Sequence, residues 1–263
     1  MITASWGMLA NLIRRVDVVV ETVDARVPTT TRSRRLERLV EMMGKKLIIA
    51  LNKADLVPRE VAEEWVRIIR GEGYEAVYLA AKEHKGTRVL RRTINRATDV
   101  RPILVGVVGY PKTGKSTIVN ALRGRAGAST SPIPGSPGYT KRPNLYKGSG
   151  QIYLLDTPGV IPPDGNPLEK ALRGAPPEKL RDPVKVAVDL IKMIKKYRPN
   201  AIQEAYGFDR EDPYEFLAEL AKRRGWFYKS DHEPLIEQAA RTIIYDYHKG
   251  KIPFYIPPSE YRR

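Results

Sequence analysis

The chain has 263 residues, no cysteine, and 46 basic against 30 acidic residues, which gives a formal net charge of +16. The lack of cysteine excludes disulfides and thiolate metal sites, and no stretch approaches the roughly 18 consecutive apolar residues of a membrane helix. The N-terminus shows no secretory pattern, so we expect a soluble, cytoplasmic protein.

Strands and helices are predicted to alternate in the first part of the chain. Apolar runs predict strands over residues 16–20, 46–51, 76–80, 103–109 and 152–155. Apolar residues at helical spacing predict helices over residues 8–13, 36–43, 60–70, 89–97 and 116–123. Such alternation predicts a mostly parallel α/β sheet with helices on both faces and functional loops at the carboxyl ends of its strands.

The composition changes at residues 161–167, which are rich in proline and glycine. Beyond this segment the strand pattern disappears, and helices are predicted over residues 183–195, 213–224 and 235–249. We therefore expect a first domain over residues 1–165 and a small all-α domain over residues 166–263.

A phosphate-binding loop is predicted where the strand 103–109 meets the following helix. Residues 109–116 read Gly-Tyr-Pro-Lys-Thr-Gly-Lys-Ser, the GxxxxGKS pattern in the strand–loop–helix context it requires. Its glycines let backbone amides face phosphate, Lys115 reaches the outer phosphates, and the Ser116 hydroxyl binds Mg²⁺. An ordinary glycine turn does not explain the adjacent Lys115 and Ser116. The expected nucleotide contacts are Gly109, Tyr110, Pro111, Lys112, Thr113, Gly114, Lys115, Ser116 and Thr117.

Two shorter motifs, each weak alone, also follow predicted strands. Residues 156–159, Asp-Thr-Pro-Gly, place Asp156 near Mg²⁺ and the amide of Gly159 near the γ-phosphate, although this pattern is most often a surface turn. Residues 52–55, Asn-Lys-Ala-Asp, begin with Asn52; the Asp55 carboxylate can accept hydrogen bonds from guanine N1–H and the N2 amine, while Lys53 covers the base. Adenine lacks this paired donor edge, so Asp55 favours GTP over ATP.

The order of these motifs is reversed relative to a Ras-like GTPase, because the base motif precedes the phosphate loop. In this order the chain resembles the circularly permuted GTPases of the YlqF/YawG family, which includes ribosome biogenesis GTPase A, over nearly its whole length. Beyond the motifs already given, the resemblance rests on residues 24–28 (Asp-Ala-Arg-Val-Pro), the base loop Ala80-Ala81-Lys82, and Pro137-Gly138-Tyr139-Thr140.

The resemblance implies a circularly permuted Ras-like P-loop GTPase domain that hydrolyses GTP to GDP with Mg²⁺. It implies that Ala80, Ala81 and Lys82 lie near the guanine base, and that Thr140 is the switch residue that senses Mg²⁺ and the γ-phosphate. The implied metal ligands are Ser116, Thr140 and Asp156, and the residues implied to act in catalysis are Lys115, Thr140, Gly159 and Lys112. The implied partner is a large ribosomal subunit precursor or its rRNA. We expect no role for DNA, and none for a membrane because no segment combines basic charge with a strongly amphipathic helix.

Two positions depart from the expected pattern. Val160 stands where Ras-like enzymes carry the glutamine that orients the attacking water. The family shares this replacement. Hydrolysis should therefore be slow until the switch region or a ribosomal partner supplies a group that orients the attacking water. Lys112 replaces the family's asparagine, which helps to bind a potassium ion. The ammonium group of Lys112 either takes over the electrostatic role of that ion or points to solvent or RNA. The replacement of asparagine by lysine argues against a bound potassium ion.

Positive charge is concentrated around the phosphate loop. Residues 91–150 contain eleven basic residues and one acid, Asp99. One nucleotide cannot use that much charge, so RNA is the expected ligand, with a solvated surface as the alternative. In the family the C-terminal domain contacts rRNA, and the contacts expected here are Lys222, Arg223, Arg224 and Lys229; an amphipathic helix before a basic turn is also typical of plain domain packing.

Other functions stay open on the sequence. They are a GTP-gated RNA-binding scaffold with negligible hydrolysis, which Val160 favours, a GTPase that acts on tRNA or another RNA, and use of ATP. The permutation also connects residues 156–165 directly to the C-terminal domain. We therefore hypothesise that a movement of Gly159 in response to the γ-phosphate is passed to that domain.

Overall fold

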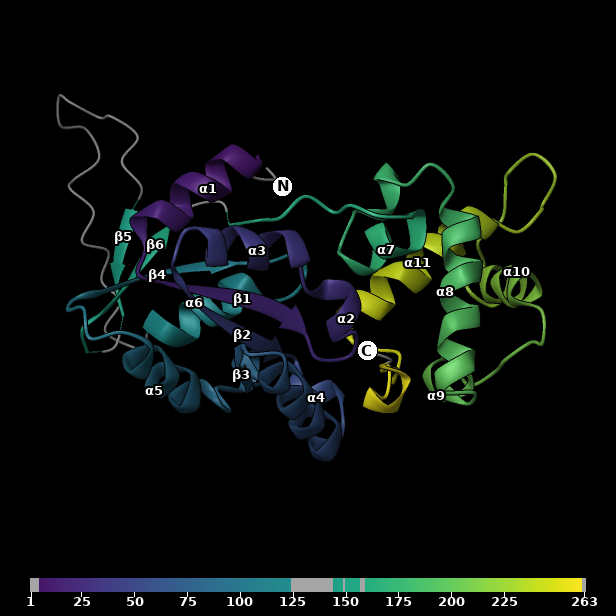
Figure 1. The fold of residues 1–263 in the computed structure, drawn as a ribbon. Helices are drawn as coiled ribbons and strands as arrows, with labels where there is room; N and C mark the ends of the chain where they lie inside the picture. The colour runs from purple at the N-terminus through teal and green to yellow at the C-terminus, as the bar shows by residue number, and fades with distance from the viewer. Residues whose placement is uncertain (1–4, 124–143, 149, 157–158, 262–263) are drawn as a thin grey trace, which may run out of the picture. The chain divides into compact units, whose positions relative to one another are not determined.

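The computed structural model describes residues 5–123, 144–148, 150–156 and 159–261. The chain divides into two compact units, residues 1–162 and 163–263. In Figure 1 the first unit contains the sheet and helices α1 to α6, and the second contains helices α7 to α11. The first unit is therefore an α/β structure and the second is helical.

The sheet of the first unit has six strands in the order β3-β2-β1-β4-β6-β5. The strands are β1 (Val18–Asp24), β2 (Lys46–Asn52), β3 (Glu75–Tyr78), β4 (Ile103–Val108), β5 (Asn144–Lys147) and β6 (Ile152–Asp156). Among the strands that the structure describes, only β5 runs antiparallel to its neighbour. Asp24 lies opposite Asn52 in the register of β1 and β2, so two motifs identified in the sequence end side by side.

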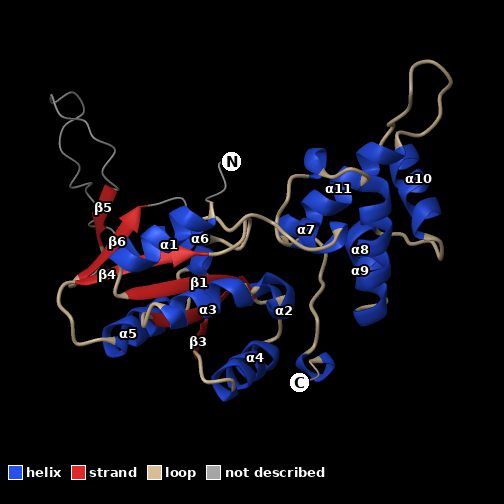
Figure 2. Ribbon diagram, turned by 45° about the horizontal axis from the view of Figure 1, so that its top comes forward, coloured by secondary structure: helices blue, strands red, loops and turns tan. Residues whose placement is uncertain are grey.

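Helices cover both faces of this sheet (Figures 1 and 2). They are α1 (Trp6–Arg15), α2 (Pro28–Thr31), α3 (Arg34–Met42), α4 (Arg59–Gly71), α5 (Thr87–Ala97) and α6 (Lys115–Arg123). Leu12 of α1 and Leu36 of α3 pack with Val19 of β1 in one apolar cluster. Leu90 of α5 and Ile118 of α6 belong to a second cluster on the other face. This arrangement confirms the predicted fold class.

The central strand β1 is buried along its whole length. A parallel strand covered on both faces is normally a continuous apolar run, and residues 18–20 fit that rule. The strand nevertheless continues beyond the predicted end at residue 20, through the buried polar residues Glu21, Thr22 and Asp24. The Oε1 atom of Glu21 accepts a hydrogen bond of 2.6 Å from the backbone amide of Ser33, which partly compensates its burial.

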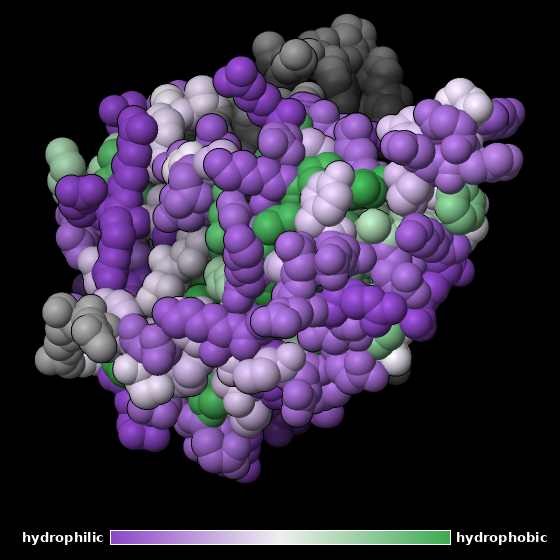
Figure 3. Space-filling model, turned by 90° about the vertical axis from the view of Figure 1, so that its right-hand side faces the viewer, coloured by the Kyte–Doolittle hydropathy of each residue, from purple (hydrophilic) through white to green (hydrophobic). Residues whose placement is uncertain are grey.

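The second unit consists of α7 (Pro167–Leu172), α8 (Pro183–Tyr197), α9 (Ala201–Tyr206), α10 (Pro213–Arg223) and α11 (Ile236–Lys249). Asp182 and Asp212 cap α8 and α10 by accepting backbone hydrogen bonds, and a proline begins each helix. Within the described ranges, no helix is long and apolar enough to span a membrane. The face drawn in Figure 3 is mostly hydrophilic, with hydrophobic residues confined to small patches.

Candidate nucleotide-binding site

The loop over residues 109–116 connects β4 to α6, and two of its glycines leave no space for a side chain. At Gly109 a Cβ atom would lie 2.5 Å from the Thr22 carbonyl oxygen. At Gly114, where φ is +98°, it would lie 2.1 Å from the Nδ2 atom of Asn52. The sequence therefore places glycine where the loop backbone comes closest to the ends of β1 and β2.

Lys115 folds back over this loop. Its Nζ atom donates a hydrogen bond of 2.7 Å to the Tyr110 carbonyl oxygen, and burial lowers the pKa of the ammonium group to about 8. No carboxylate among the described side chains forms an ion pair with it. A cation in this position is costly without a compensating negative charge. The loop and its lysine thus fit an anion such as a phosphate group.

Asn52 connects the phosphate loop to the base loop. Its Nδ2 atom donates to the Thr113 carbonyl oxygen at 2.9 Å, and its Oδ1 atom accepts from the Ala81 amide at 3.1 Å. The side chain is buried, and Thr113 lies 61 positions further along the chain. The side-chain amide of Asn52 therefore fixes the positions of both loops. The sequence predicted Asn52 as a nucleotide contact and did not predict this structural role.

The Asp24 carboxylate holds Lys53 and Arg26. Its Oδ2 atom lies 2.7 Å from the Nζ atom of Lys53 and 2.8 Å from the Nη2 atom of Arg26, which is fully buried. Burial alone would raise the pKa of Asp24, but the charges of Arg26 and Lys53 outweigh it and hold that pKa well below its usual range. Burial also lowers the pKa of Lys53. The Asp-Ala-Arg segment thereby fixes the lysine of the base motif.

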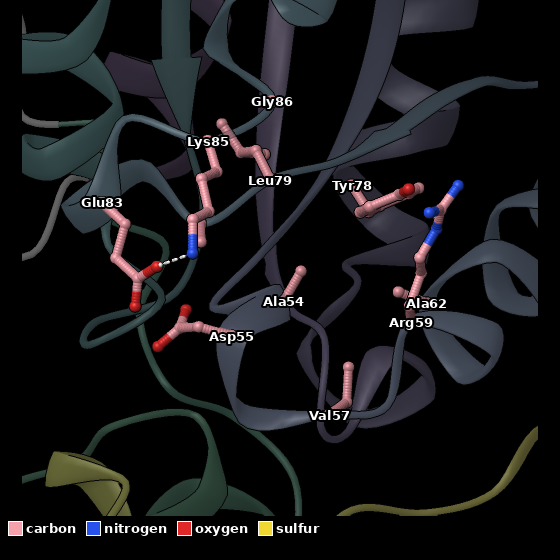
Figure 4. A pocket seen from close by; sticks show the side chains of 11 residues that line it. Ala54, Asp55, Val57, Arg59, Ala62, Tyr78, Leu79, Glu83, Lys85 and Gly86 are labelled. Carbon is pink, nitrogen blue, oxygen red and sulfur yellow. Dashed lines mark ion pairs between the residues drawn. The ribbon is translucent and has the colours of Figure 1, made fainter.

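Asp55 is exposed and borders a pocket of about 360 Å³ at the carboxyl ends of β2 and β3 (Figure 4). Ala80 of the base loop also borders it, and a Lys85–Glu83 ion pair of 2.6 Å lies at its rim. The remaining residues around the pocket are Ala54, Val57, Arg59, Ala62, Tyr78, Leu79 and Gly86. Asp55 and Ala80, both predicted to recognise the base, thus line the same pocket. Lys82, a third predicted residue, is exposed and does not line it.

Gly159 lies against the start of the phosphate loop. The Gly109 amide donates to the Gly159 carbonyl oxygen at 3.0 Å, and the Ile161 amide donates to the Gly109 carbonyl oxygen at 3.0 Å. A Cβ atom on Gly159 would lie 2.3 Å from the Val107 carbonyl oxygen. Val160 is half-buried beside it. The predicted γ-phosphate-sensing glycine and the phosphate loop are therefore brought together.

Other predicted residues are placed only in part. Ser116 lies exposed in the first turn of α6, and Lys112 is exposed with a φ of +63°. Asp156 ends β6, but its side chain is not described. Residues 137–140, which include Thr140, and residues 157–158 lie outside the described ranges. Of the three predicted metal ligands, the structure thus locates the side chain of Ser116 alone.

The predicted RNA contacts cluster at the end of α10. Lys222, Arg223 and Arg224 are consecutive there, and Lys229 lies in the loop before α11; all four are exposed. The Nε atom of Arg223 lies 2.7 Å from a carboxylate oxygen of Glu219, and its guanidinium lies over the ring of Phe208. Arg223 is therefore engaged within its own unit.

A basic cavity in the second unit had no sequence signal, because its residues come from separate elements without a motif. Its volume is about 580 Å³, and it lies beside the first turns of α7 and α8. The basic residues around it are Lys170, Lys179, Arg181 and Lys185, and the acids are Asp182 and Asp189.

Comparisons with known proteins agree with this geometry. Residues 7–164 match the family model described as RsgA GTPase. An uncharacterized GTP-binding protein of Methanocaldococcus jannaschii is 36% identical over 252 residues, which cover 93% of this chain and 65% of that protein. Nucleolar GTP-binding protein 2 of Saccharomyces cerevisiae is 33% identical over 265 residues, which cover 97% of this chain and 53% of that protein. The chain thus spans about half to two thirds of the length of these relatives.

The fold also matches solved structures. GNP-bound YlqF from Thermotoga maritima superimposes with a TM-score of 0.72 and 24% sequence identity, over 95% of each chain. A GDP-bound YlqF structure gives a TM-score of 0.69 over 95% of this chain and 98% of that one. At this identity the likeness concerns the fold. Together with the family model, which covers more than half of the sequence, it shows that the chain belongs to the RsgA GTPase family and has the circularly permuted fold that its motif order predicted.

Proposed function

We propose that this protein binds GTP and hydrolyses it to GDP and phosphate. The observation that carries the proposal is the buried ammonium of Lys115 in a glycine-lined loop, which Asn52 ties to the base loop. The loop accounts for phosphate binding and Asp55 for the choice of guanine. Family membership supports the same activity.

The three oxygen donors predicted from the sequence suit Mg²⁺, which prefers oxygen ligands, and the structure places the side chain of Ser116 at the end of the loop. The Ser116 hydroxyl, the Asp156 carboxylate and the Thr140 hydroxyl would hold the ion, which supplies positive charge beside the β- and γ-phosphates when bound. Lys115 binds the outer phosphates, and the Gly159 amide reads the γ-phosphate. Val160 cannot orient water, so we expect slow hydrolysis until a partner supplies that function.

We further propose that nucleotide state controls affinity for a large ribosomal subunit precursor. The names of the nucleolar relatives and the excess of basic residues support this partner. A switch that is ordered only with GTP would give the two nucleotide states different affinities. With this partner we expect the protein in the cytoplasm of a cell that has no nucleus.

Replacement of the predicted guanine-reading carboxylate tests nucleotide choice. Asp55→Asn should weaken GTP binding at least tenfold and shift preference toward xanthosine triphosphate, whose 2-oxo group accepts a hydrogen bond from the new amide. Isothermal titration with GTP, xanthosine triphosphate and ATP measures this change. Asp99→Asn, another exposed acid of the same unit, serves as the control. Unchanged preference in Asp55→Asn would contradict guanine recognition at this position.

Sedimentation with ribosomal subunits tests the proposed partner. The full chain should co-sediment with large subunits more strongly with a non-hydrolysable GTP analogue than with GDP, and subunits should accelerate turnover. Absence of turnover with subunits would indicate a GTP-gated scaffold. Failure to co-sediment, together with binding to tRNA, would indicate a GTPase that acts on another RNA.

A further inference from the structure

Helix α5 presents a row of three arginines to solvent. Arg88, Arg92 and Arg96 follow one another at four-residue intervals and are all exposed, whereas Leu90 and Ile94 are buried on the opposite side of the helix. We call these three residues the α5 arginine ridge. Successive ridge residues are separated by roughly 6 Å along the helix axis. In Figures 1 and 2, α5 lies on the outside of the first unit, across the sheet from α1 and α3.

The ridge places three positive charges on one exposed face of the helix. None of its three guanidinium groups forms an ion pair with a residue that the structure describes. Nearby polar groups are engaged elsewhere: Arg91 donates to the Ala121 carbonyl oxygen, and Lys85 pairs with Glu83. Arginines four residues apart also repel one another and destabilise a helix. The arrangement is thus unfavourable for the isolated helix.

Two other helices of the same unit show the opposite pattern. Helix α4 carries three acidic and three basic residues, and Arg59 lies 2.7 Å from Glu63. Helix α3 mixes glutamate with arginine, and Arg34 lies 3.0 Å from Glu37. Helix α5 has four arginines and no acid. Helices α1 and α6 also lack acids but carry two basic residues each, so α5 has the highest density of unmixed positive charge among these helices.

From these observations we propose that the α5 arginine ridge binds the ribose-phosphate backbone of RNA. Guanidinium groups donate paired hydrogen bonds to phosphate oxygens. A row of them along one helix fits a line of phosphates and carries no sequence information. The inference rests on the proposed function, because it assigns a surface to the RNA of the subunit precursor. It assigns to one helix face part of the RNA binding that the charge of residues 91–150 led us to expect, in addition to the predicted C-terminal contacts.

Salt dependence distinguishes this contact from general electrostatic attraction. Each phosphate neutralised by a cation contributes about 0.7 to 0.9 to the slope of log binding constant against log salt concentration. Neutralisation of all three ridge residues in Arg88→Gln/Arg92→Gln/Arg96→Gln should therefore lower the magnitude of that slope by about 2. We expect affinity for large-subunit rRNA at low salt to fall at least tenfold.

A matched triple variant controls for net charge. Arg15→Gln/Arg38→Gln/Arg67→Gln removes the same charge from exposed positions on α1, α3 and α4. The full chain of each variant is titrated with protein-free large-subunit rRNA at several KCl concentrations. Basal GTP hydrolysis and thermal unfolding are measured alongside. Neither variant should change basal hydrolysis, and only the ridge variant should show the reduced salt slope.

The possible results distinguish failure of the ridge assignment from failure of the proposed function. Equal losses of rRNA affinity in both triple variants, or no loss in either, would overturn the assignment of RNA binding to the α5 arginine ridge. Neither result would contradict RNA binding by the protein as a whole. Unchanged rRNA binding by the ridge variant, with weaker binding to intact subunits, would instead indicate that α5 docks on a ribosomal protein. If the unaltered chain binds no rRNA in any nucleotide state, the proposed rRNA partner fails and the ridge assignment fails with it, whereas the proposed GTP hydrolysis is tested separately.

Discussion

Lys112 is the residue at which this phosphate loop departs from its family's pattern, and its conformation bears on potassium dependence. Its φ of +63° is uncommon for a residue with a Cβ atom, and its side chain is exposed. We propose that its ammonium supplies the positive charge that a potassium ion provides where asparagine stands. The sequence identified this substitution but could not predict the backbone conformation that accompanies it.

The first prediction is that potassium does not accelerate hydrolysis by the unaltered protein. Rates in KCl and NaCl at equal ionic strength should agree within about twofold, because in the proposed role the Lys112 ammonium supplies the positive charge that potassium would add. Lys112→Asn removes that ammonium, so this variant should become potassium-stimulated. Steady-state phosphate release measures both rates. Clear potassium stimulation of the unaltered protein would contradict the proposed role of Lys112.

At the scale of elements, the loops that the sequence predicted to hold the nucleotide do follow strands in the structure, because each comes after a strongly apolar run. The sequence prediction missed β5, whose four residues include Asn144 and Lys147 and therefore lack an apolar run. It also missed α2, α7 and α9, which have four to six residues each. Helices this short span fewer than two turns, so apolar periodicity cannot reveal them. The loops were predictable because their signals are local.

The junction between the two nucleotide loops yields a second prediction. Gly114→Ala should destabilise the protein by about 3 kcal/mol, because positive φ costs about 1 kcal/mol and displacement of Asn52 sacrifices two buried hydrogen bonds. GTP affinity should also fall at least tenfold. Chemical denaturation and nucleotide titration measure the two effects.

A second glycine provides the control for backbone strain. Gly44 has a φ of +64°, and a Cβ atom there would meet no other atom within 4 Å. Gly44→Ala should therefore cost about 1 kcal/mol and leave GTP affinity unchanged. Equal effects of the two substitutions would show that the contact with Asn52 contributes nothing beyond the strain.

At the scale of the whole molecule, the α/β class and the permuted order followed from the sequence, whereas its buried charge network did not. Glu21 in β1 faces Arg32, Ser33, Glu37 and Arg34 from the α2–α3 segment. Arg32 also lies 2.9 Å from Glu72, which follows α4. These partners are brought together by tertiary packing, and no periodicity or local motif relates their positions in the chain. Only the folded structure identifies Glu21 as a buried acid.

That acid makes the stability of the fold depend on pH. Burial, followed by the negative charge of Glu37, raises the pKa of Glu21 from 4.5 to about 8. The folded state therefore holds the proton more tightly than the unfolded chain. The resulting stabilisation is complete below pH 4.5, declines as the pH rises between 4.5 and 8, and is absent above 8. The decline cannot exceed about 1.4 kcal/mol per pH unit for one proton.

The third prediction isolates this contribution with Glu21→Gln, which cannot ionise. The unfolding free energy of the unaltered protein, minus that of the variant, should fall steadily between pH 5 and pH 8, because every other titrating group is common to both. Urea denaturation at half-unit pH intervals gives this difference. Glu75→Gln, at an exposed glutamate of β3, should show no such trend. A difference that stays constant across this range would mean that Glu21 is ionised in the folded protein and that the positive charges of Arg32 and Arg34 outweigh its burial.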